Sequence, residues 1–143
     1  MASYYPDNVQ SGNAFQERTG GLNEVACVWD IGSATLGTAD VLYGPTVPAG
    51  ARIIGVTLGA TDLDTSNTLT LDVGDATDDN RLMNAASIGT AGGESTTIVA
   101  ASRGYEYTAA TQINVTPQAA AAGGVAGGVV TLKLSYIVVE ATT

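Results

Sequence analysis

Six aspartates fall within the 18 residues that run from Asp62 to Asp79, and they form the densest group of potentially reactive side chains in the chain. The six are Asp62, Asp64, Asp72, Asp75, Asp78 and Asp79. Carboxylate oxygens are the ligands that Ca²⁺ prefers, and a pair of carboxylates can hydrolyse a glycosidic bond. In loops, however, Asp most often accepts hydrogen bonds from nearby backbone N–H groups and thereby fixes a turn.

The spacing of these aspartates favours the turn-fixing role. The segment 62–67 begins like an EF-hand loop, but Asn67 stands where that loop needs Gly and Val73 where it needs Glu. The segment 72–79 has enough oxygens for a cation but no recognised ligand spacing. A glycosidase also needs an aromatic sugar platform, and Trp29 is expected in the core. We therefore predict no metal ligands, and a cation in either loop stays an open alternative.

The remaining sequence offers little catalytic chemistry. The chain has no histidine, which removes the commonest general base, the Ser–His and Cys–His pairs and every His-ligated metal site. Its single cysteine, Cys27, stands between apolar residues and is expected to be a buried thiol. The glycines of segment 123–127 lack the Lys of a phosphate-binding loop. We expect no catalytic residues and no cofactor, so the chain is predicted not to be an enzyme.

Composition narrows the class of partner. The 143 residues suffice for one domain; 45% are hydrophobic, and only 13% are charged, about half of the usual share of roughly 25%. The net charge is −9, and the five basic residues are dispersed rather than clustered. Nucleic acid and anionic membranes need a positive patch, so neither is an expected partner. Without a disulfide, a signal peptide or an apolar span of ~20 residues, we expect synthesis in a reducing cytoplasm.

Hydrophobic residues recur with a period of two, which is typical of half-buried strands. Val25, Cys27, Trp29 and Ile31 share one face of the first strand. The last strand is the strongest, with apolar residues alternating from Val130 to Val138. At about 3.3 Å per residue its 11 or so residues span ~35 Å, so we expect it to lie centrally.

Three further segments give more specific expectations. The segment 52–58 is predicted to be a strand with Ile54, Val56 and Leu58 facing inward. A short strand over 39–43 is expected to end at Gly44 and Pro45, and another around 113–115 to stop at Pro117.

Eight or nine short strands with turn signals every eight to twelve residues, and no convincing helix, predict an all-β fold. We expect a single antiparallel β-sandwich domain over 22–143, jelly-roll-like in its strand count. Residues 1–21 lack either periodicity and are predicted to be an extended N-terminal arm. Tyr4, Tyr5, Phe15 and Arg18 stand alone among polar residues of this arm, so we predict that they contact a partner protein or a neighbouring chain.

Several runs of residues carry a resemblance to a known family. They are residues 48–54 (PAGARII), 62–64 (DLD), 69–79 (LTLDVGDATDD), 104–107 (GYEY) and the long terminal strand rich in Val, Thr and Leu. Over roughly residues 20–140 the chain resembles the capsid decoration, or cement, proteins encoded beside the major capsid protein of tailed bacteriophages.

The resemblance implies a β-sandwich that binds the outer surface of the virion capsid and stabilises it. Its partners would be the major capsid protein and other copies of itself in a homotrimer. Two other functions stay open: another virion component of the neck, tail or fibre, and a carbohydrate- or host-binding module. The last of these predicts an exposed aromatic platform, for which Tyr105 and Tyr107 are the candidates.

Overall fold

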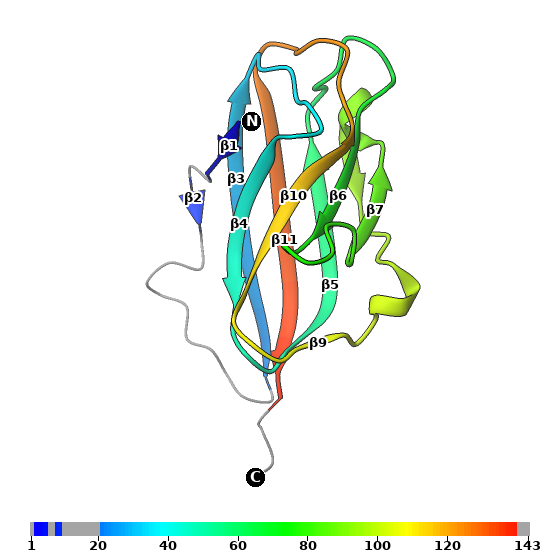
Figure 1. The fold of residues 1–143 in the computed structure, drawn as a ribbon. Coiled ribbons are helices and arrows are strands. Elements are labelled where there is room, and N and C mark those ends of the chain that lie inside the picture. The colour runs from blue at the N-terminus through cyan, green and yellow to red at the C-terminus, as the bar shows by residue number, and fades with distance from the viewer. Residues whose placement is uncertain (1, 6–7, 10–20, 140–143) are drawn as a thin grey trace.

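Two β-sheets packed face to face make up the fold of the computed structural model (Figure 1), which describes residues 2–5, 8–9 and 21–139. The first sheet has the order β1-β4-β10-β6-β7, and the second has the order β2-β3-β11-β5-β8, with β9 also paired to β5. The strands are β1 (Ser3–Tyr4), β2 (Asn8–Val9), β3 (Leu22–Gly32), β4 (Val41–Val47), β5 (Ala51–Ala60), β6 (Thr70–Gly74), β7 (Met83–Ala86), β8 (Gly93–Ser95), β9 (Glu106–Tyr107), β10 (Thr111–Ala119) and β11 (Gly128–Val138).

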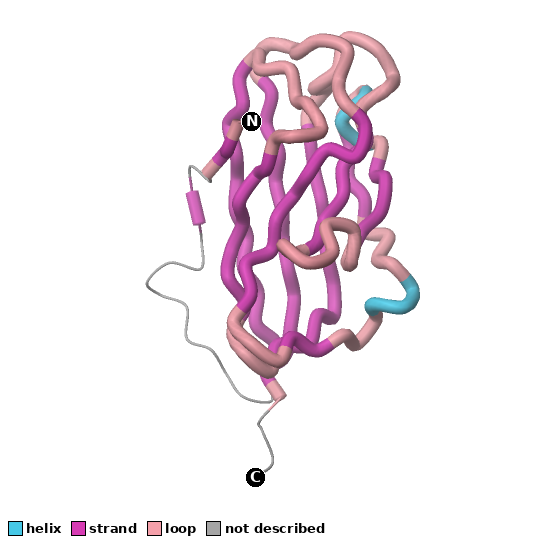
Figure 2. The backbone as a smooth tube through the Cα atoms, in the orientation of Figure 1, coloured by secondary structure: helices cyan, strands magenta, loops and turns pink. Residues whose placement is uncertain are grey.

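This architecture confirms the predicted antiparallel sandwich, although the short pair of β1 with β4 is parallel. Successive long strands from β3 to β6 alternate between the two sheets, as in a jelly roll. Figure 2 shows how strongly strands dominate. The helices of the described residues are two 3₁₀ turns, Ile88–Thr90 and Ala100–Ser102, and neither is long enough to span a membrane.

The core lies between the sheets and is built from the alternating inward residues of the long strands. The predicted inner face of β3 is confirmed, because Val25, Cys27, Trp29 and Ile31 are all buried. The indole Nε1 of Trp29 donates a hydrogen bond to the backbone oxygen of Tyr43, 3.1 Å away on β4. This bond satisfies the one polar group of a fully buried ring and joins the two sheets.

Strand β11 holds the centre of the second sheet, as its length predicted. It pairs with β3 along one side and with β5 along the other, over almost its whole length. Val130, Leu132, Leu134 and Tyr136 are buried on its inner face. A strand that is paired on both sides and covered by a second sheet needs apolar residues at every second position, which is the pattern in the sequence.

The prediction that Ile54 faces inward is wrong. Its side chain is 53% exposed, whereas Ile53 and Val56 are buried at 1% and 3%. The cause is a β-bulge, since Gly55 lies opposite Ser135 while Ile53, two positions earlier, lies opposite Tyr136. The extra residue on β5 shifts the alternation by one position and turns Ile54 to the outside.

The two prolines do not end their strands as predicted. Strand β4 continues through Gly44 and Pro45 to Val47, and β10 continues through Pro117 to Ala119. Strand β1 pairs only with Val41 and Leu42, so the described part of β4 beyond them has one partner strand, β10. Strand β10 likewise pairs only with β6 beyond Val115. Proline is accepted where a strand has a free side or a register shift, and both conditions occur here.

Candidate interaction surface and the acidic loops

Asp64 organises the loop that joins β5 to β6. Its carboxylate is 3% exposed and accepts backbone N–H bonds from Ser66, Thr68, Leu69 and Ala122 at 2.8–3.1 Å, together with the Thr68 hydroxyl at 3.0 Å. Burial alone would raise the pKa of Asp64, but these backbone donors, led by Leu69, outweigh burial and hold the pKa below its usual range. The oxygens are thus occupied by the chain's own donors.

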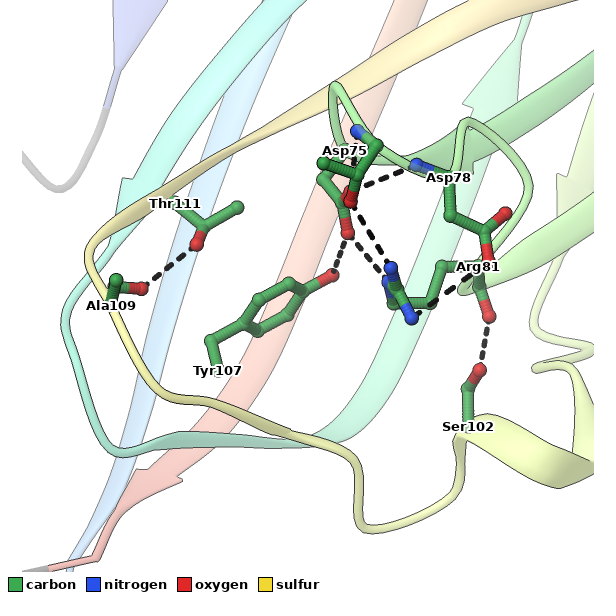
Figure 3. A network of polar contacts seen from close by, with 8 residues as sticks. Asp75, Asp78, Arg81, Ser102, Tyr107, Ala109 and Thr111 are labelled. Atoms are coloured by element: carbon green, nitrogen blue, oxygen red, sulfur yellow. Dashed lines mark hydrogen bonds and ion pairs between the residues drawn. The ribbon is translucent and has the colours of Figure 1, made fainter.

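Asp75 is the centre of a second network, drawn in Figure 3. Its Oδ1 accepts the backbone N–H groups of Thr77 and Asp78 and the Thr77 hydroxyl, at 2.6–3.0 Å. Its Oδ2 accepts Arg81 Nε at 2.7 Å and the Tyr107 hydroxyl at 3.1 Å. Burial raises the pKa of Asp75, but the bonds from Thr77 and Arg81 dominate and lower it to about 2.

Arg81 and Tyr107 connect this network to the rest of the sandwich. The Arg81 guanidinium lies 4.5 Å from the Tyr105 ring centroid, and its backbone oxygen accepts a bond from the Ser102 hydroxyl. Burial, followed by the charge of Asp75, raises the pKa of Tyr107 above its usual range. Arg81 also lies 3.8 Å from the more exposed carboxylate of Asp78.

The third buried aspartate, Asp72, fixes the backbone of β7. Its Oδ1 accepts the N–H of Ala85 at 2.7 Å, and Ala85 has φ of 53°, a left-handed conformation that alanine rarely adopts. Burial raises the pKa of Asp72, and the bond from Ala85 opposes this only in part.

These contacts confirm the turn-fixing interpretation for Asp64 and Asp75. The six aspartates do not converge: within the described ranges, no three His, Cys, Asp or Glu side chains are placed to hold a metal ion. The described residues of the acidic loops therefore do not bring three carboxylates together in a geometry that would coordinate a cation.

The N-terminal residues that the structure describes are paired with the sandwich rather than free of it. Tyr4 lies in β1 and packs against the core, and Tyr5 stacks on Tyr43 with ring centroids 5.4 Å apart. Both rings therefore have a partner within the chain, which the sequence did not predict. Tyr5 is still 70% exposed and can contact a second molecule. Phe15 and Arg18 lie outside the described residues.

An aliphatic patch that the sequence did not predict lies on the outer face of the second sheet. It consists of the exposed Leu22 and Ile54 with the half-buried Ile137; Leu22 is 61% exposed and lies directly opposite Ile137 across the β3–β11 pair. The bulge in β5 turns Ile54 outward, and a period-two pattern does not reveal such a bulge, so the sequence did not predict the patch.

Two ion pairs lie on the same sheet: Lys133 with Glu24 at 3.4 Å and Arg52 with Glu106 at 3.2 Å.

The aromatic platform expected of a sugar-binding module is absent from Tyr105 and Tyr107. Tyr107 is 4% exposed, and Tyr105 is packed edge-on against it at 4.9 Å between centroids. Their rings serve the Asp75–Arg81 network, so they present no flat surface to a sugar.

Three solved structures that resemble this chain come from phage capsids. No protein-family model and no curated protein matches the chain. A chain in the capsid of Ralstonia phage GP4 matches with a TM-score of 0.72 and 25% identity, over 89% of this chain and 90% of that one. A chain in the cyanophage Pam1 capsid asymmetric unit matches with a TM-score of 0.67 and 26% identity, over 92% and 95%.

A third match, in the acidic stable capsid structure of Helicobacter pylori bacteriophage KHP30, has a TM-score of 0.60 over 87% of this chain and 94% of that one. At 12% identity it supports the fold alone. The sandwich and the first two similarities define a phage capsid-related structural protein.

Proposed function

We propose that the chain is a decoration, or cement, protein that binds the outer surface of a phage capsid and stabilises the shell. The observation that carries the proposal is the similarity of nearly the whole chain to chains in two phage capsid structures. This similarity supports a structural role in a phage capsid. The resemblance of the sequence runs to decoration proteins supports the narrower role.

The physical properties of the chain suit this role. Fourteen acidic residues against five basic ones repel other copies at long range and keep the protein dispersed before assembly. A homotrimer engaging several capsid sites together would gain avidity without strong single contacts. Tyr5, Leu22 and Ile54 supply exposed apolar groups for such contacts.

The role we propose is non-enzymatic. The buried carboxylates of Asp64 and Asp75 are saturated with donors from the chain itself, and a saturated carboxylate is a poor general acid or base.

Co-sedimentation with capsids that lack this protein tests the proposal. We expect the number of bound copies to be proportional to the number of subunits in the assembled capsid, and we expect no binding to free capsid subunits. Binding should also raise the temperature at which the shell opens. Light scattering should give a solution mass of three times 14.3 kDa. A few copies per particle would support a neck, tail or fibre component instead, and no binding to particles would refute the proposal.

A further inference from the structure

A pocket of about 250 Å³ lies on the outer face of the first sheet, between β4, β10 and the loop that follows β6. Its walls come from Val41, Tyr43, Ala76, Asp79, Asn114 and Thr116, with Asp75 beside them. The β10 residues Asn114 and Thr116 alternate with the buried Ile113 and Val115, so they belong to the face turned away from the core.

Two oxygens at this pocket have no hydrogen-bond partner within the described part of the chain. They are Asn114 Oδ1 and Thr116 Oγ1, and both atoms are buried. Buried polar atoms in native proteins are nearly always paired, so each exception needs an explanation. An amide oxygen can only accept, which means that the missing partner of Asn114 is a donor.

The electrostatics of the pocket also call for a donor that carries positive charge. Asp79 is exposed at the pocket and makes no ion pair among the described residues, and none of the lining residues is basic. Asp75 also lines the pocket, but its charge is paired with Arg81, so Asp79 carries the unpaired negative charge there. Tyr43, whose ring also stacks on Tyr5, lines the pocket and offers an aromatic group beside which a planar cation can lie.

We propose that this pocket binds an arginine side chain of a neighbouring protein in the particle, an inference that rests on the proposed function. A guanidinium group offers five N–H donors in one plane, enough to serve Asn114, Thr116 and Asp79 together. A lysine ammonium offers three donors and lacks the planar surface that stacks on Tyr43.

Thr116 supplies the sharpest variant. Thr116→Val keeps the β-branched shape and removes only the unpaired oxygen, so the fold is expected to be as stable as the wild type or more stable. Its affinity for arginine should nevertheless fall. A stability gain that coincides with a loss of binding is the signature of a group retained for a ligand.

The test is an amide-resolved NMR titration with N-acetyl-arginine amide, alongside N-acetyl-lysine amide and the uncharged N-acetyl-norleucine amide. We expect saturable shifts at Ala76, Asp79 and Asn114 that arginine produces at lower concentration than lysine and norleucine does not produce. Asp79→Asn and Thr116→Val should each weaken arginine binding about fivefold or more. The matched control is Asp62→Asn, which removes the same charge from a different loop and should leave binding unchanged.

The inference is overturned if arginine produces no saturable shifts, if norleucine produces the same ones, or if Asp62→Asn weakens binding as much as Asp79→Asn. Co-sedimentation separates this failure from failure of the proposed function. Wild-type protein that binds capsids without an arginine site refutes the pocket alone. If the wild-type protein binds no particle, the proposed function is refuted. If Thr116→Val or Asp79→Asn loses both arginine binding and capsid binding, the result supports the arginine pocket and the proposed function together.

Discussion

Single buried carboxylates determine how the loops of this sandwich are held. Asp75 joins the end of β6, the following loop and β9 by accepting five hydrogen bonds. A buried charge is tolerated only when its partners replace the water that it loses, and these donors do so. Nothing local distinguishes Asp75 from Asp78 or Asp79 in the sequence, because the distinction depends on Arg81 and Tyr107 arriving from other segments.

Replacement of Asp75 by Asn should lower the free energy of unfolding by about 3 kcal/mol near neutral pH, because Arg81 then loses its buried counter-charge. The effect should depend on pH. The folded-state pKa of Asp75, about 2, lies below its ordinary 3.8, so its ionised form stabilises the fold above about pH 4. That contribution, about 2 kcal/mol, is lost as the pH falls through 3.8 toward 2.

Urea unfolding of wild type and Asp75→Asn at several pH values measures this difference, and the gap between them should narrow on acidification. Asp78→Asn is the matched control, since its carboxylate is more exposed and lies 3.8 Å from Arg81. It should cost less than about 1 kcal/mol. A gap of constant size down to low pH would contradict the assigned role of the Asp75 charge.

At the scale of elements, the bulge in β5 decides which isoleucine belongs to the core. Ile53→Ala should cost about 3 kcal/mol, because it leaves a cavity beneath Tyr136 and the facing sheet. Ile54→Ala should cost less than about 1 kcal/mol, because its side chain is 53% exposed. Urea unfolding of the two variants measures both values, and equal costs would contradict the observed register.

The same bulge shows how far the sequence predicts the elements. Alternation alone located β3 and β11 and the inward residues of each, because these strands keep a regular register over their apolar positions. It failed at Ile54, Pro45 and Pro117, where the answer depends on the partner strand. A bulge or a one-sided strand is a property of a pair, and a single strand's residues do not encode it.

The features of the candidate site likewise divide into those that the sequence predicted and those that depend on contacts between distant segments. The loops rich in Asp were predicted to fix turns, and Asp64 does so with donors close in sequence, such as Ser66 and Thr68. The aliphatic patch and the arginine pocket were not foreseen, since each gathers residues from strands far apart in the chain. Asn114 and Thr116 carry no sequence signal, and only the loop that lies over them makes their oxygens notable.

At the scale of the whole molecule, the N-terminal strands β1 and β2 lie along one side of the sandwich (Figure 1). Strand β1 pairs with β4, and β2 pairs with β3, so the segment adds a short strand to one edge of each sheet. Exposed strand edges invite pairing with other chains, and covering them protects a soluble monomer or trimer from aggregation. The segment therefore has a role within the chain as well as its predicted contact with a partner.

Deleting residues 1–20 tests both roles together. The core from β3 to β11 remains, so the truncated chain should still unfold cooperatively, with a loss of about 1–2 kcal/mol from the missing pairs and the Tyr5–Tyr43 stack. Its binding to capsids should fall, because Tyr5 and the predicted contacts Phe15 and Arg18 are removed. Urea unfolding and co-sedimentation measure the two effects separately.

Tyr5→Ala tests the proposed capsid contact while leaving the strand pairs of β1 and β2 in place. Because the Tyr5 ring is 70% exposed, its loss should change stability by no more than about 1 kcal/mol while lowering capsid occupancy. Gln118→Ala, at an exposed position of β10, is the control and should change neither. If the truncated chain and Tyr5→Ala both occupy capsids like the wild type, the segment serves only to cover β3 and β4. The capsid contact must then come from the folded sandwich, where Leu22 and Ile54 are the other exposed large apolar side chains among the described residues.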